Sequence, residues 1–234
     1  MSMHRSWSKG YTKDTHPSVK KISDTMRKKK IDNFKKWRAE QVRACKLVVN
    51  FKPLKRNGDL AELIGVVLGD GHIQKFPRTE RLLIFSNANN PQFVARYEKI
   101  VREMFQKEPY VYRQSTQNCI RISLYQNCIS ERLGIPSGPR KGIDFVVPRW
   151  ILSRREYAIR YLRGLYEAEG SVSIHLPTST HKFSFSNTNQ SLLDAVENLM
   201  NKFGFRTSRD AVRVQISRKA EVAQAVALIE FRKY

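Results

Sequence analysis

The sequence predicts an internally duplicated α+β domain with about a hundred residues per repeat, preceded by a basic and mainly helical arm. Three observations predict it. Two apolar helical segments each end in an acidic residue followed by glycine, the same order of helix-like and strand-like segments follows each of them, and positive charge is concentrated in the first 58 residues. The 234 residues leave room for one duplicated domain and a small appendage.

The two apolar segments are Leu63–Gly71 and Leu162–Gly170. In each, small residues recur four positions apart and therefore lie on one helix face. They are Gly65 and Gly69 in the first segment and Gly164 and Ala168 in the second. Glycine inside a helix costs about 0.5–1 kcal/mol relative to alanine, and close approach of another backbone is the usual compensation. The two helices are therefore expected to pack against each other.

An acidic residue, Asp70 or Glu169, stands at the end of each segment, where the helix dipole is already negative. Two carboxylates side by side at such ends repel each other unless a cation lies between them. Hard divalent cations, which bind carboxylate and carbonyl oxygens, suit this arrangement. Either segment alone is also compatible with a buried helix that ends in a turn with a left-handed glycine cap, but the repetition favours a shared site.

The segments that follow the two motifs also match. Both contain Phe-Ser-Asn-x-Asn, with Asn87 and Asn187 offset by 100 residues whereas Asp70 and Glu169 are offset by 99. Amphipathic helices are then predicted over 93–105 and 192–203, and alternating strands over 119–124 and 211–216, with Arg121 and Arg213 in matching places. The chain is therefore an internal duplication.

These paired motifs resemble the two-repeat LAGLIDADG homing endonucleases, over about residues 59–234. The resemblance implies an αββαββα order in each repeat, a pseudo-twofold axis between the motif helices and two antiparallel sheets that form a DNA-binding saddle. The expected boundaries are a basic arm with its linker over 1–58, a first repeat with the connector over 59–147 and a second repeat over 148–234. By the same resemblance, Asp70 and Glu169 are the catalytic, metal-binding acids, one for each DNA strand, and the carbonyls of Gly69 and Ala168 help to hold the metal.

The resemblance implies a site-specific, metal-dependent endonuclease that hydrolyses both strands of a long, asymmetric DNA target. Magnesium is the expected cation, because it accepts octahedral oxygen coordination and keeps bound water. Since the halves are joined and differ in sequence, the working unit is expected to be a monomer. Two alternatives remain open: an RNA-splicing maturase that binds intron RNA, and a DNA-binding protein that does not cleave.

The polar residues expected to support catalysis depart from the family pattern, in which Gln and Lys often occupy the strand after each motif. This chain has Ser86 and Asn87 in the first repeat and Ser186 and Asn187 in the second. Lys182, Arg218 and Lys219 are candidates for the missing positive charge, and simple phosphate contacts are an equally good interpretation of these three residues. Glu167, which is one residue away from the acid-glycine position, is expected to serve helix packing.

Strand side chains in the major groove are expected to determine specificity. The candidates in the first repeat are Gln74, Lys75, Arg78, Arg81, Arg113, Gln114, Gln117 and Arg121. Those in the second repeat are His175, Thr178, His181, Lys182, Arg206, Ser208, Arg209, Arg213 and Gln215.

A polyanionic partner is expected from the charge alone, since 43 Lys and Arg against 21 Asp and Glu give a formal net charge of +22. Residues 1–58 contain 17 basic and 4 acidic side chains, a net of +13. Aromatic and apolar residues such as Trp7 and Trp37 interrupt the basic runs, which favours a small structured module that binds DNA partly through phosphates. Lys28, Lys29 and Lys30 are its candidate contacts, although a basic triplet is also typical of a solvated run or a localisation signal.

The three cysteines, Cys45, Cys119 and Cys128, have no metal-ligand spacing and are expected to be reduced. No apolar run approaches the roughly 18 residues of a membrane helix, and no apolar signal core is visible at the N-terminus. The sequence therefore predicts a soluble, intracellular protein, in the cytoplasm or in the organelle matrix that contains its DNA target, with no membrane partner.

Overall fold

A computed structural model describes residues 8–32, 34–43, 52–114, 117–140 and 142–234. By its internal contacts the chain separates into two units, Met1–Phe51 and Lys52–Tyr234. The expected roles of Trp7 and Cys45 and part of the expected linker fall outside the described residues. Within the described part, Cys119 and Cys128 are free thiols, and no helix is long and apolar enough to cross a membrane.

The first unit contains two helices, α1 (Pro17–Lys28) and α2 (Lys35–Arg43). Pro17 is the first residue of α1, and Nδ1 of His16 accepts a hydrogen bond from the backbone N–H of Ser18, so the start of the helix is well capped. None of the residues of α1 is buried. The arm is therefore helical, as predicted, and presents its basic side chains to solvent.

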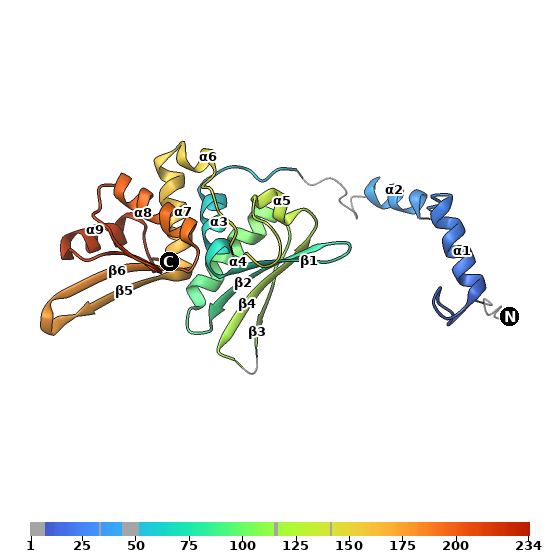
Figure 1. Ribbon diagram of the computed structural model, residues 1–234, viewed down its shortest axis with the longest axis horizontal. Helices are drawn as coiled ribbons and strands as arrows, with labels where there is room; N and C mark the ends of the chain where they lie inside the picture. The colour runs from blue at the N-terminus through green and yellow to red at the C-terminus, as the bar shows by residue number, and fades with distance from the viewer. Residues whose placement is uncertain (1–7, 33, 44–51, 115–116, 141) are drawn as a thin grey trace. The chain divides into compact units, whose positions relative to one another are not determined.

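The second unit repeats one order of elements (Figure 1). The first repeat consists of α3 (Gly58–Asp70), β1 (Gly71–Lys75), β2 (Glu80–Asn87), α4 (Pro91–Phe105), β3 (Tyr110–Arg113), β4 (Cys119–Gln126) and α5 (Ile129–Leu133). The second consists of α7 (Arg155–Glu169), β5 (Gly170–His175), the 3₁₀ turn η1 (Leu176–Thr178), β6 (Thr180–Ser186), α8 (Gln190–Lys202), β7 (Ser208–Asp210), β8 (Arg213–Ile216) and α9 (Lys219–Leu228). A short helix, α6 (Arg149–Leu152), lies in the connector.

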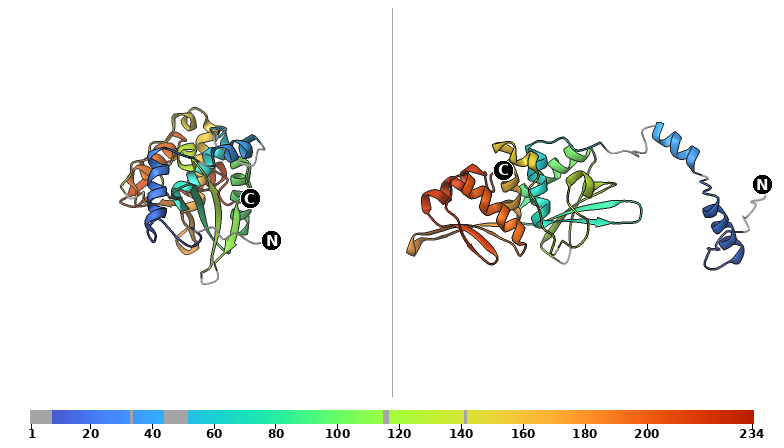
Figure 2. Two further views of the ribbon diagram at one scale, coloured as in Figure 1. Left: turned by 90° about the vertical axis from the view of Figure 1, so that its right-hand side faces the viewer. Right: turned by 45° about the horizontal axis from the view of Figure 1, so that its top comes forward.

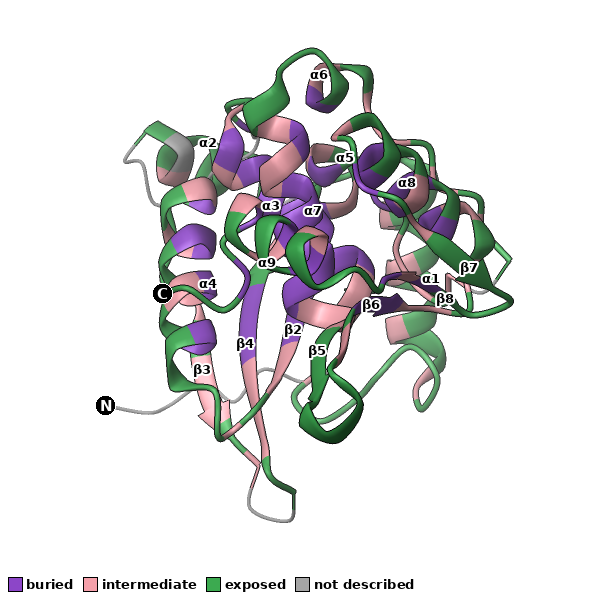
Figure 3. Cartoon of the chain, turned by 90° about the vertical axis from the view of Figure 1, so that its left-hand side faces the viewer, coloured by how far each residue is buried: buried purple, intermediate pink, exposed green. Residues whose placement is uncertain are grey.

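Each repeat forms a four-stranded antiparallel sheet, in the order β1-β2-β4-β3 or β5-β6-β8-β7. The identical strand order confirms the duplication and the predicted fold class. In both sheets the helices lie over one face, the helix side, and leave the other face open (Figures 1 and 2). The burial pattern agrees, because apolar side chains such as Ile84 and Phe185 are fully buried on the helix side and the edge strand β5 is mostly exposed (Figure 3).

The two sheets meet where α3 packs along α7, as the small residues predicted. A Cβ atom on Gly65 would lie 2.9 Å from the backbone nitrogen of Leu165, and one on Gly164 would lie 2.8 Å from that of Val66. Real Cβ contacts are almost never this short, so the helix backbones touch at these glycines. Apolar residues beside them, including Leu63 and Leu162, are fully buried, and the central core therefore joins the two repeats.

Candidate active site between the motif helices

Asp70 and Glu169 are the last residues of α3 and α7, and the strands β1 and β5 begin directly after them. The two helix ends are in contact, since a Cβ atom on Gly69 would lie 3.1 Å from Cγ of Glu169 and would collide with Ala168. The sequence therefore identified a pair of acids that the fold brings together.

The glycines after the acids have an unexpected role. Gly71 and Gly170 have φ of −96° and −88°, which is extended backbone, so neither is the left-handed cap that a simple helix end would have. A Cβ on Gly71 would lie 2.5 Å from Cα of Val67, and a Cβ on Gly170 would lie 2.8 Å from the ring of Tyr166. Glycine is required because the chain folds back tightly onto the preceding helical turn at both positions.

The carboxyl groups are electrostatically strained. Burial, and secondly the charge of Glu169, raise the pKa of Asp70 to about 7, while burial raises the pKa of Glu169 above its ordinary value. Among the described residues, no lysine, arginine or histidine forms an ion pair with either carboxyl, and no group of three or more His, Cys, Asp or Glu side chains suited to a metal is present. The pair thus fits a divalent cation that completes its shell from carbonyls, water and substrate oxygens.

The pKa of Asp70 makes stability depend on pH in a predictable direction. Between about pH 4 and 7 the folded Asp70 keeps a proton that the unfolded chain has released, so stability without metal falls as pH rises through this window. The variant Asp70→Asn is expected to unfold at a higher temperature than the parent at pH 8 and at an equal temperature at pH 4. Differential scanning fluorimetry in a chelator measures both values. Added magnesium should raise the midpoint of the parent at pH 8 and not that of the variant; equal responses would contradict a cation at Asp70.

The matching Phe-Ser-Asn segments do not occupy matching places, which corrects the equivalence expected from sequence. Gly71 pairs with Ile84 in the first sheet, and Gly170 pairs with Phe185 in the second. Position 84 is therefore equivalent to 185, an offset of 101 rather than 100. A shift of one residue turns a side chain to the other face of a sheet.

The shift makes the surroundings of the two acids unequal. On the helix side, Ser86 in the first repeat is the structural equivalent of Asn187 in the second. The amide Nδ2 of Asn187 lies 3.5 Å from Oε1 of Glu169. Asn87 lies on the open face, where its Oδ1 accepts a hydrogen bond from Nδ2 of Asn118 at 3.0 Å. Of the expected supporting residues, only Asn187 is hydrogen-bonded to an acid of the pair.

The candidates for replacement charge lie elsewhere. Lys182 is exposed in the middle of β6, Arg218 pairs with Glu221 at 3.3 Å, and Lys219 is the exposed first residue of α9. In the described part of the chain, none of them contacts the acids.

The strand pairing also shows which of the expected DNA-contacting residues lie on the open faces of the sheets and which lie on the helix side. The open faces carry Gln74, Arg81, Arg121, His175, Lys182, Ser208, Arg213 and Gln215, with Gln114 hydrogen-bonded to Arg121. Arg78, Gln117, Thr178 and Arg206 lie in turns and loops, and Lys28, Lys29 and Lys30 are exposed in the arm. Lys75, Arg113, His181 and Arg209 fall on the helix side, contrary to a role on the open surface. Arg209 is instead paired with Asp194 and Glu197 of α8.

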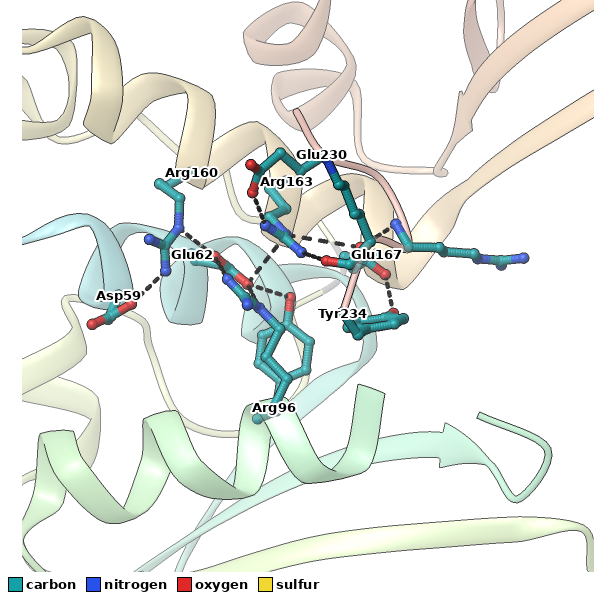
Figure 4. Close-up of polar contacts among 11 residues, drawn as sticks. Asp59, Glu62, Arg96, Arg160, Arg163, Glu167, Glu230 and Tyr234 are labelled. Atoms are coloured by element: carbon teal, nitrogen blue, oxygen red, sulfur yellow. Dashed lines mark hydrogen bonds and ion pairs between the residues drawn. The ribbon is translucent and has the colours of Figure 1, made fainter. Parts of the chain in front are cut away.

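A buried ionic cluster beside the helix interface was not expected from the sequence (Figure 4). Glu62 is fully buried and accepts hydrogen bonds from Arg96 at 2.5 and 2.8 Å, from Arg160 at 2.5 Å and from the hydroxyl of Tyr97 at 3.1 Å. Although burial alone would raise the pKa of Glu62, these arginines and Arg163 hold it below its ordinary value. The cluster joins α3 and α4 of the first repeat to α7 of the second.

The cluster continues to the end of the chain. Arg163 pairs with Glu230 at 2.6 Å and donates to the carbonyl of Lys233, while Glu167 accepts hydrogen bonds from the backbone N–H of Arg232 at 2.6 Å and from Tyr234. Glu167 therefore serves packing, as its offset from the acid-glycine position indicated.

Comparison with known proteins agrees with this architecture. Residues 156–226, which lie within the second repeat, match the family model of the LAGLIDADG-like domain. The second repeat is therefore similar to this domain in sequence. No curated protein matches the chain in sequence. Solved LAGLIDADG structures match over both repeats.

Mesophilic variants of the homing endonuclease I-DmoI share 18% identity with a TM-score of 0.53, covering 76% of this chain and 97% of theirs. I-DmoI in complex with DNA and Mn gives 18% and 0.51, covering 74% and 96%. The N-terminal LAGLIDADG domain of DUF199/WhiA gives 14% and 0.51, covering 79% and 89%. The chain thus has the two-repeat LAGLIDADG fold, as the sequence predicted.

Proposed function

We propose that this protein is a site-specific DNA endonuclease that hydrolyses one phosphodiester in each strand with the help of a divalent cation. The observation that carries the proposal is the contact between the two acid-bearing helix ends, which brings Asp70 and Glu169 together, with neither carboxyl in an ion pair among the described residues. Similar proteins support the chemistry, because I-DmoI has been solved with DNA in the presence of Mn, Ca or Mg.

In this proposal Asp70 and Glu169 bind the cation through carboxylate oxygens, and the carbonyls of Gly69 and Ala168 lie beside them. Magnesium, when bound, would polarise the scissile phosphate and lower the pKa of an attacking water. The amide of Asn187 orients the carboxylate of Glu169. Asp70 must lose its proton before it can bind metal, and the cation that neutralises the pair favours that loss.

The positive charge of the chain supplies the affinity for DNA in this proposal. The open faces of the sheets lie on the side where β1 and β5 leave the acids, so a duplex along these faces would bring its backbone to the acid pair (Figure 1). The exposed Lys28, Lys29 and Lys30 add phosphate contacts from the arm. The protein acts as a monomer, because one chain holds both acids and both sheets.

A cleavage selection on a randomised duplex library with magnesium tests this function. The parent is run beside the double variant Asp70→Asn/Glu169→Asn. Cleavage of one long sequence by the parent alone is the expected result. Retention of the same DNA by both proteins without cleavage would leave a binding protein, and retention of intron RNA in place of DNA would favour a maturase.

A further inference from the structure

The open faces of the two sheets differ in a way that bears on how DNA sequence is read. On the first sheet, arginines stand opposite aromatic residues across neighbouring strands: Arg81 pairs with Tyr125, and Arg121 pairs with both Phe85 and Tyr112. These residues form what we call the arginine–aromatic surface. Its side chains lie where a duplex would contact the sheet.

The two arginines of this surface are held in place by specific contacts. The guanidinium of Arg81 lies 5.1 Å from the ring centroid of Tyr125, and its Nε donates to Oγ of Ser123 at 2.9 Å. The guanidinium of Arg121 lies 5.4 Å from the ring of Phe85 and 5.7 Å from that of Tyr112, whose hydroxyl accepts from Nη1 at 3.1 Å. Their rotamers are thus fixed before DNA arrives, which lowers the entropy lost on binding.

Both arginines keep N–H groups that are free to donate hydrogen bonds to a DNA base. Nothing in the described part of the chain accepts a hydrogen bond from Nη1 or Nη2 of Arg81. Arg121 donates one N–H of Nη1 to the hydroxyl of Tyr112 and one N–H of Nη2 to Gln114, so each of these nitrogens keeps a second N–H. Two parallel N–H groups match the O6 and N7 acceptors of guanine in the major groove.

The second sheet lacks this arrangement. With Ile84 and Phe185 as equivalent positions, Arg81 corresponds to Lys182. By the same strand pairing, Phe85 corresponds to Ser186, Tyr112 to Asp210 and Arg121 to Arg213. The two aromatic residues beside Arg121 are therefore replaced by a hydroxyl and a carboxylate beside Arg213. Lysine is a mobile point charge that cannot present a rigid pair of donors.

We propose that the two repeats read DNA unequally. The arginine–aromatic surface specifies guanine-bearing base pairs in the half-site under the first repeat, whereas the second repeat binds its half-site mainly through the backbone and tolerates base changes. This inference rests on the proposed function, because it takes duplex DNA as the substrate.

A binding selection on randomised duplexes tests it. The full chain carrying Asp70→Asn/Glu169→Asn retains DNA uncut, and the same protein with Arg81→Lys added keeps the charge and loses the fixed pair of donors. The expected binding motif has strong base preferences in one half-site and weak base preferences in the other. In the informative half, Arg81→Lys should reduce the preference for guanine at one position by about 5- to 150-fold.

Lys182→Gln is the matched control at the equivalent position of the second sheet. It should weaken binding evenly across sequences and leave the motif unchanged. The variant Tyr125→Leu removes the ring under Arg81 and leaves the arginine in place, so it should weaken the same guanine preference. Thermal unfolding of each variant checks that it folds. Equal information in both halves, or a motif indifferent to both Arg81→Lys and Tyr125→Leu, would overturn the inference.

Cleavage of the selected duplex by the parent is then measured separately. An asymmetric motif without cleavage would remove the proposed nuclease function and leave this inference standing. Cleavage within a motif whose two halves are equally specific would support the nuclease function and overturn the unequal reading. Failure to retain any duplex would overturn both proposals.

Discussion

Replacing either Asp70 or Glu169 alone by asparagine is expected to lower the rate of double-strand cleavage by about 10³-fold or more and to leave DNA binding nearly unchanged. The physical reason is that a cation contributes several kcal/mol of charge stabilisation in the transition state, and each unit of 1.4 kcal/mol is tenfold in rate. Asparagine keeps the shape of Asp70 and is one methylene shorter than Glu169. At both positions it removes the charge that holds the cation, so the loss should fall on chemistry rather than on affinity.

Strand-specific end labels on the selected duplex measure the effect, because they follow each strand separately. Glu108→Gln is a suitable control, since Glu108 is an exposed surface residue whose partner is Arg102. It should cleave at the parental rate. Cleavage of both strands at near-parental rates by Asp70→Asn would remove the acid pair as the cation site.

The variant Glu62→Gln is expected to destabilise the Lys52–Tyr234 unit by about 3–5 kcal/mol, which is the usual cost of removing one partner from a buried ion pair. The loss is large because Glu62 is fully buried and balances Arg96 and Arg160 directly. Glutamine fills the same volume and provides no negative charge, so the arginines remain partly buried without their counter-ion.

Urea unfolding followed by tryptophan fluorescence or circular dichroism gives the free-energy difference. Glu103→Gln provides the contrast, because Glu103 is half exposed and lies 4.0 Å from Lys99 in a surface pair. Such pairs contribute about 0–1 kcal/mol. If both glutamine variants cost the same small amount, the cluster would not stabilise the contact between the repeats.

The catalytic candidates could be predicted from sequence because their signal is local. Small residues four positions apart, Gly65 with Gly69 and Gly164 with Ala168, indicated that each helix packs closely against another backbone. The acid that follows each of these faces was therefore expected where the two helices meet. The duplication then specified that each helix is the other's partner. The duplication and the meeting of Asp70 with Glu169 follow from these facts without coordinates, and the details of the fold follow from the family resemblance that the motifs carry.

The supporting residues could not be predicted in the same way. The Phe-Ser-Asn match placed Asn87 and Asn187 together. Pairing between strands decides which face a residue occupies, and the pairing gives an offset of 101 between the repeats where the sequence match gives 100. A hint was present in the sequence, since the offset between repeats changes from 99 at the acids to 100 at the asparagines. The strict alternation of Phe183-Ser-Phe-Ser186 also indicated an inward Phe185.

What the sequence by itself determined is the duplicated fold, the basic character of the chain and the pair of acids, because each depends on patterns within one helix or one repeat. Only the tertiary structure decided that Glu62 is buried among arginines, that Arg209 turns to α8, and that Arg81 rather than Lys182 is held against an aromatic ring. These facts depend on neighbours that are distant in sequence, and a charged side chain has the same local pattern whether it meets water, another helix or DNA.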